Sequence, residues 1–187
     1  MSISIKGTSI PGCYLMVPTI FQDNRGVFVK TYEKNVFEQL GINTDYPEEF
    51  YSISYKNVLR GLHFQTPPHD LCKIVSCVQG SVLDVVVDLR VGSPAYGKSE
   101  VLKIDQDNAN MVYIPPGVAH GFYVTSASSV LTYKVSKYHS KDNDKGIHWA
   151  KAGVSWPKGI SPITSQRDES FPSLFEFKSP FIYKDKK

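Results

Sequence analysis

Four side chains that can move or stabilise charge stand within stretches rich in β-forming residues. His63 lies in VLRGLHFQ, Lys73 opens KIVSCVQ, His120 follows the turn in YIPPGVAHGF, and Tyr133 alternates with apolar residues in VLTYKV. An imidazole takes up a proton near neutral pH because its unperturbed pKa is about 6.5. An ammonium in a water-poor site stabilises a developing oxyanion. These residue types indicate a site that transfers a proton and stabilises a developing negative charge.

The spacing of three of these side chains raises the alternative of a metal site. His63, Gln65 and Lys73 fall where the first cupin motif has two histidines and a glutamate, and the stretch that delivers His120 resembles the second cupin motif. An ammonium in the ligand shell would repel a divalent cation. We therefore expect no metal and no cofactor. A cupin oxygenase with His63, Gln65 and His120 as ligands remains an alternative, which elemental analysis would detect.

The segment around His63 also predicts an irregular strand. Arg60 and His63 are an odd number of residues apart, so on a regular strand their side chains point to opposite faces. Gly61, between them, tolerates a bulge or a sharp twist. If both side chains serve one pocket, the ladder breaks at this glycine.

The elements that position these residues are mostly strands. Short runs rich in Val, Ile, Tyr, Phe and Thr recur between turn signals, as in an all-β sandwich or barrel. One helix is expected at 33–41, with Val36, Phe37 and Leu40 on one face. Examples of the expected strands lie at 27–32, 50–55, 73–79, 81–90, 111–114, 121–126 and 130–138.

The apolar pattern predicts how the layers are arranged. Val85, Val86 and Val87 are consecutive, which is typical of a strand covered on both faces. The last forty residues are interrupted by prolines and read as a tail wrapped over the body. With 187 residues and 41% hydrophobic content, one domain over 1–187 is expected.

Composition excludes several classes of protein. A formal net charge of +3 is too small and too dispersed for a nucleic-acid surface. No run of eighteen apolar residues and no secretory leader pattern occurs, so a membrane protein or a secreted protein is not expected. Three cysteines without a CxxC pair argue against a disulfide framework or a zinc knuckle and favour the cytoplasm.

Longer segments are similar to a known family, the sugar-nucleotide 3,5-epimerases typified by dTDP-4-dehydrorhamnose 3,5-epimerase. The resemblance is carried by DNRGVF, RGLHFQ, DLRVGSPAYG, YIPPGVAHGF, YKVSKY, KGIHW and ISPITSQRD, in the order and spacing of the family. It implies a cupin-type jelly-roll β-sandwich with one or a few short helices. It also implies proton abstraction and return at C3, C5 or both of a nucleotide-linked 4-keto-6-deoxy sugar, in deoxysugar and polysaccharide biosynthesis.

The resemblance assigns the catalytic roles. It makes His63 the general base, held by Asp168, and makes Tyr133 the acid on the opposite side. Lys73 and His120 would lie near the reacting ketone and the sugar. A carboxylate behind the imidazole would fix its tautomer and support the imidazolium.

The resemblance also implies a set of substrate-binding residues. Arg25 and Arg60 resemble positions that contact the nucleotide or its diphosphate, and Tyr138 could stack on the nucleotide base. Gln65 and His120 complete the matching positions. His69, His139 and His148 are given no catalytic role.

Several positions that are expected to contact the substrate depart from the family pattern. Those on the N-terminal side are Lys30, Glu48 and Phe50; in the family a glutamate stands at the first, and amides at the other two. Near the C-terminus, Asp144 replaces a glutamate and Arg167 a lysine. The family's N-terminal strands cross a dimer interface, so we expect a homodimer with shared sites in which Lys30, Glu48 and Phe50 serve the partner's site.

Further functions remain open at this point. A sugar-nucleotide 3,4-ketoisomerase would share the fold and an enolate-type intermediate, and product analysis would separate it. A binding or assembly protein would keep the fold without turnover. The sequence does not name the sugar, the nucleotide base or the number of inverted carbons.

Overall fold

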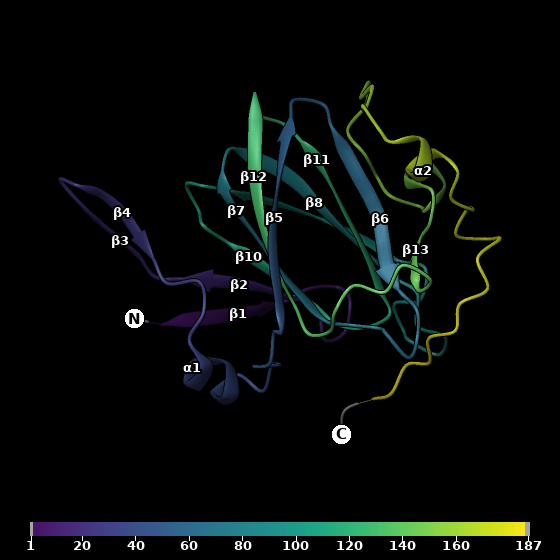
Figure 1. Ribbon diagram of the computed structural model, residues 1–187, viewed down its shortest axis with the longest axis horizontal. Helices are drawn as coiled ribbons and strands as arrows, with labels where there is room; N and C mark the ends of the chain where they lie inside the picture. Colours follow the sequence, from purple (N-terminus) through teal and green to yellow (C-terminus); the bar gives the residue numbers. More distant parts are fainter. Residues whose placement is uncertain (1, 186–187) are drawn as a thin grey trace.

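The computed structural model of the protein describes residues 2–185, and two antiparallel sheets form its body (Figure 1). The first has the strand order β1-β2-β10-β7-β12-β5. Its strands are β1 (Ile3–Gly7), β2 (Tyr14–Pro18), β10 (Met111–Ile114), β7 (Lys73–Gln79), β12 (Ser128–Val135) and β5 (Glu48–Tyr55).

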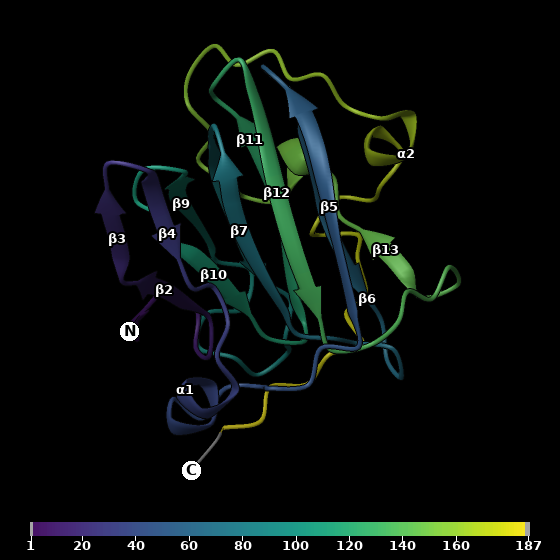
Figure 2. The same cartoon turned by 60° about the vertical axis from the view of Figure 1, so that its left-hand side comes forward.

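The second sheet has the order β13-β6-β11-β8-β9. Its strands are β13 (Asp144–Gly146), β6 (Leu59–Gln65), β11 (Val118–Val124), β8 (Ser81–Asp88) and β9 (Ser99–Asp105). A separate hairpin of β3 (Ile20–Asp23) and β4 (Gly26–Val29) projects from the body, as Figures 1 and 2 both show. The expected all-β sandwich is confirmed, and a strand overlaps each of the seven runs named above.

Short helices complete the chain. Helix α1 (Lys34–Gln39) lies within the expected range and buries Phe37. The 3-10 helix η1 (Trp149–Lys151) and helix α2 (Gln166–Glu169) lie in the C-terminal part, which the sequence patterns left without elements. None of the helices in residues 2–185 is both long enough and apolar enough to span a bilayer.

Alternating burial places one face of each sheet in the core. On β12, Leu131 and Tyr133 are buried between the sheets, where they pack with Val75, Val86 and Phe122. Residues one position away on the same strand are partly exposed. This alternation arises because successive side chains of a strand point to opposite faces.

The C-terminal tail covers the outer face of the five-stranded sheet. Val85 and Val87 pack there against tail residues such as Phe177 and Phe181, whereas Val86 points into the sandwich. The prediction that this strand is covered on both faces is therefore confirmed. In Figure 1 the tail, drawn in yellow, runs along the side of β6 and β13.

Candidate active site

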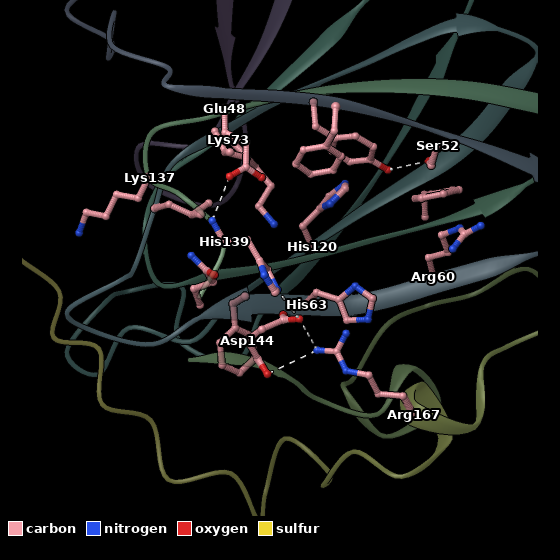
Figure 3. A pocket seen from close by; sticks show the side chains of 17 residues that line it. Glu48, Ser52, Arg60, His63, Lys73, His120, Lys137, His139, Asp144 and Arg167 are labelled. Atoms are coloured by element: carbon pink, nitrogen blue, oxygen red, sulfur yellow. Dashed lines mark hydrogen bonds and ion pairs between the residues drawn. The ribbon is translucent and has the colours of Figure 1, made fainter. Parts of the chain in front are cut away.

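A cavity of about 500 Å³ opens between the two sheets (Figure 3). Side chains of both sheets, of the segment after β12 and of helix α2 line it. They are Glu48, Phe50, Ser52, Arg60, His63, Phe64, Gln65, Leu71, Lys73, His120, Phe122, Tyr133, Val135, Lys137, His139, Asp144 and Arg167. Ten of the fourteen residues expected in the site are among these, whereas Asp168 lies behind the wall.

Strand β6 is irregular at Gly61, as expected. His63 pairs with His120 and Arg60 with Phe122, so Gly61 and Leu62 together oppose one residue of β11. Gly61 has a φ of +132°, and a Cβ there would lie 2.6 Å from the Cα of Gly121. Because of the bulge, the side chains of Arg60 and His63 both point into the same cavity. The hypothesis of a shared pocket is confirmed.

His63 and Asp168 form a close pair. His63 Nε2 lies 2.7 Å from Asp168 Oδ1, and the backbone N–H of Gly61 donates to Oδ2 at 3.1 Å. Because a carboxylate only accepts, Nε2 carries the hydrogen and Nδ1 keeps its lone pair. Burial by itself raises the pKa of the Asp168 carboxyl, but the hydrogen bonds from His63 and Gly61 outweigh it and hold that pKa below its usual range.

Helix α2 delivers Asp168 from a part of the chain far from β6. Ser165 begins the helix, and its side chain accepts a hydrogen bond from the Asp168 N–H at 3.1 Å. The segment before α2 is tied to the start of β6, because Leu59 N donates to the Ile163 carbonyl at 2.9 Å. These local contacts bring the carboxylate next to the strand that carries the imidazole.

His120 has a carboxylate partner that the sequence patterns did not single out. Its Nε2 lies 2.7 Å from Asp84 Oδ2, and both side chains are buried. Burial lowers the pKa of His120, and the charge of Asp84 opposes this shift. The available signal was an aspartate within the apolar run SVLDVVVD, because a buried carboxylate requires a partner.

Lys73 lines the same cavity from the start of β7. Burial lowers the pKa of its ammonium to about 8, against the opposing charges of Asp144 and Asp84. The side chain is therefore a cation near neutral pH that can lose its proton within the working range. Such a donor suits an oxyanion more than it suits a metal cation.

Tyr133 faces the cavity from the sheet opposite His63. Its hydroxyl lies 3.5 Å from Ser52 Oγ, and its ring stacks on Phe50 at a centroid distance of 4.8 Å. Burial raises the pKa of the Tyr133 hydroxyl, so it holds its proton. The phenol is thus a proton donor on the wall facing the imidazole.

Polar side chains surround the rest of the cavity. Arg60 Nε donates to Ser54 Oγ at 3.0 Å, and Arg167 Nη2 lies 2.8 Å from Asp144 Oδ2. Glu48 accepts a hydrogen bond from the His139 N–H at 3.0 Å, as the dashed line in Figure 3 shows. His139 and Lys137 line the cavity although the sequence patterns did not select them; both follow β12 directly.

Three expected residues lie outside this cavity. Arg25, at the tip of the β3–β4 hairpin, pairs with Asp23 at 2.6 Å. Lys30 pairs with Glu33 at 2.9 Å. Tyr138 has 68% of its surface exposed and does not line the cavity, and its role in substrate binding stays a prediction. The next residue, His139, lines the cavity instead.

The expectation that Glu48 and Phe50 serve a partner's site is wrong. Both lie on β5, which pairs with β12 of the same chain over its whole length, and both line the chain's own cavity. The earlier hairpin, β3–β4, is the part that projects away from the body (Figure 1). The sequence resemblance placed all three departures on crossing strands, whereas the strand pairing separates Lys30 from the other two.

The residues present do not fit a metal. Gln65, at the position of a cupin histidine ligand, donates through Nε2 to the carbonyls of His69 and Tyr138 and accepts from Ser140 N. Its amide is thus turned to the backbone. Lys73 brings an ammonium to the next ligand position, and within residues 2–185 no three His, Cys, Asp or Glu side chains are grouped to hold an ion.

Fold and site together define a cupin-type jelly-roll enzyme whose cavity is lined by imidazole, ammonium and phenol side chains. The chain belongs to the dTDP-4-dehydrorhamnose 3,5-epimerase family, whose model matches residues 7–176, and is an isomerase. A curated relative, the dTDP-4-dehydrorhamnose 3,5-epimerase of Sinorhizobium fredii, is 36% identical over 95% of this chain and 93% of its own length.

Solved structures agree with this assignment. The dTDP-6-deoxy-D-glucose-3,5-epimerase of Legionella pneumophila, in complex with dTDP-4-keto-L-rhamnose, has a TM-score of 0.92 and 32% identity and covers 98% of this chain and 100% of its own. A 3'-monoepimerase of Streptomyces bikiniensis, in complex with dTDP-quinovose, has a TM-score of 0.86 and 30% identity, over 90% and 86%.

Proposed function

We propose that this protein epimerises a nucleotide-diphosphate-linked 4-keto-6-deoxy sugar at C3, C5 or both. The observation that carries the proposal is the placement of a base and an acid on facing walls. His63 lies on β6 with Asp168 behind it, and Tyr133 lies on β12 of the other sheet. Inversion at carbon requires removal of a proton from one face and return to the other.

The roles follow from the chemistry of a ketone. The 4-keto group acidifies the neighbouring C–H bonds, and His63 Nδ1 takes the proton while the electron pair moves to the ketone oxygen. The Lys73 ammonium stabilises the resulting enolate oxygen. Tyr133 then donates its hydroxyl proton to the opposite face of the carbon, and the phenolate is reprotonated from solvent. No redox step and no cofactor is required.

Solvent exchange tests this function. The protein is incubated in D₂O with 4-keto-6-deoxy sugars linked to dTDP, GDP, CDP or UDP, and deuterium at C3 and C5 is followed by NMR and mass spectrometry. We expect incorporation and inversion with one nucleotide series, and loss of both in His63→Ala. Absence of exchange at either carbon with all four series would sink the proposal.

A single-centre outcome is the second candidate. Its support is that Glu48 and Phe50 stand inside the cavity where the family usually has amides, and that a structural relative is a 3'-monoepimerase. Unpaired buried polar groups are costly enough to change which substrate is accepted. Deuterium at one carbon only, with inversion at that carbon, would identify this outcome.

We also propose a homodimer that shares its sites. The β3–β4 hairpin exposes four apolar side chains, and β5 exposes others along its outward face. Projecting apolar surface of this kind is typical of an interface. Arg25 and Lys30 would then reach the partner's cavity. The apolar residues are Ile20, Phe21, Val27, Phe28, Tyr51, Ile53 and Tyr55.

The cytoplasmic location expected from composition stays a prediction.

A further inference from the structure

Glu169, next to Asp168 on α2, has an unusually complete set of hydrogen-bond donors for a half-exposed carboxylate. Trp149 Nε1 donates to its Oε1 at 3.0 Å, and Thr164 Oγ1 donates to the same oxygen at 2.5 Å. His148 Nε2 lies 3.2 Å from Oε2. These hydrogen bonds, led by the one from Thr164, hold the pKa of Glu169 below its usual range.

The tautomer of His148 makes it a donor to Glu169. Its Nδ1 accepts a hydrogen bond from the Ala150 N–H at 3.1 Å, so in the neutral ring the hydrogen is on Nε2. Nε2–H then points at the carboxylate. Each oxygen of Glu169 therefore has at least one donor from a segment outside helix α2.

The segment that supplies two of these donors is itself bonded to the strand that carries His63. Ile147 and Leu62 exchange both backbone hydrogen bonds, at 3.0 and 3.2 Å, and Gly146 pairs with His63 in the ladder of β13 and β6. His148 and Trp149 follow directly. A closed path of contacts thus runs from His63 along β13 to Glu169, and back through Asp168 to the imidazole.

We propose that Glu169 is a positioning residue for the His63–Asp168 pair: it fastens α2 to the 147–149 segment and so sets the place of the Asp168 carboxylate. The inference rests on the proposed function for its kinetic consequence only. Helix α2 has four residues and a single capping side chain, so its own hydrogen bonds cannot hold it rigidly. Catalytic groups require support of this kind because small displacements are costly.

The kinetic test compares Glu169→Ala and Glu169→Gln with Glu176→Ala in the full chain. Glu176 is a matched control, because it is a tail glutamate whose hydrogen-bond donor within residues 2–185 is Ser173. We expect Glu169→Ala to lower kcat about tenfold with KM changed less than about twofold. Glu169→Gln keeps one acceptor oxygen and should lose less, and Glu176→Ala should behave as the unchanged protein.

A double-mutant cycle separates positioning from general destabilisation. In an Asp168→Asn background, Glu169→Ala should cause no further loss, because the carboxylate that it positions is already gone. If Glu169→Ala lowers kcat by the same factor with and without Asp168→Asn, the proposal is overturned. Thermal melts of each variant establish that the proteins compared are folded, and Glu169→Gln serves if the alanine variant is not.

A spectroscopic readout keeps this test independent of turnover. The His63 ring N–H that donates to Asp168 should give a resolved downfield proton resonance, assigned by its absence in His63→Asn. Glu169→Ala should broaden or shift this resonance, and Glu176→Ala should leave it unchanged. An unaltered resonance in Glu169→Ala would refute positioning, whereas absence of epimerisation in the unchanged protein would refute the proposed function and leave this result valid.

Discussion

The ring of Phe50 lies parallel to the ring of Tyr133, at a centroid distance of 4.8 Å and an interplanar angle of 15°. The two residues are direct partners in the β5–β12 ladder, and both line the cavity. A family member with an amide at position 50 would not have this ring. Phe50 therefore covers one face of the proposed acid and restricts the directions in which its hydroxyl can point.

We predict that Phe50→Asn uncouples proton exchange from inversion. His63 should still form the enolate and return a solvent proton to the same face, whereas delivery by Tyr133 should fall about tenfold because its ring is no longer held. The measurement is the ratio of deuterium exchange to inverted product. Phe50→Leu keeps the apolar cover without the stack and should give an intermediate ratio; an unchanged ratio in both variants would contradict the role of the ring.

The pH dependence of activity should report Lys73. Its ammonium has a pKa of about 8, so the protonated form needed for the enolate is lost as pH rises through that value. Tyr133 does not interfere, because burial raises its pKa. We expect kcat/KM to fall about tenfold per pH unit above pH 8. In Lys73→Arg the guanidinium stays charged, and the remaining activity should not fall above pH 8. A fall above pH 8 that persists in Lys73→Arg would show that another group titrates there.

Shared sites predict recovery of activity from two inactive variants. Arg25→Ala and His63→Ala should each be inactive or nearly so as homodimers. In the mixed dimer, one cavity has His63 from one chain and Arg25 from the other. Random pairing makes about half of the dimers mixed, with one intact site of two, so co-expression should restore about a quarter of the activity. If the hairpin serves its own chain, no site is intact and nothing is restored.

Gly61→Ala should damage both stability and activity. The φ of +132° is unfavourable for alanine, and the new Cβ would meet the backbone of Gly121 at 2.6 Å. We expect the free energy of unfolding to fall by about 1–3 kcal/mol, measured by urea denaturation. Activity should fall further than stability explains, because the bulge aims His63. Gly7→Ala is the control: no heavy atom lies within 4 Å of its Cβ, and it should change little.

Much of the fold was predictable from the sequence because local patterns determine it. Alternation places Leu131 and Tyr133 on one face of a strand, and consecutive valines indicate a strand covered on both sides. The bulge at Gly61 followed from parity together with the hypothesis that Arg60 and His63 serve one pocket, since their side chains cannot share a face on a regular strand. The catalytic candidates came from their residue types together with the resemblance to a known family.

Long-range packing decided the rest. Three residues of the site contact partners that are distant in the sequence: Asp84, Glu169 and His139. No sequence periodicity links them to these partners. The same limit explains the error about Glu48 and Phe50, because which strand pairs with β5 depends on how the whole sheet is assembled. The sequence by itself determined the strands, the bulge and the kinds of chemistry; only the tertiary structure decided which carboxylate stands behind which histidine, because those contacts form when separate segments pack together.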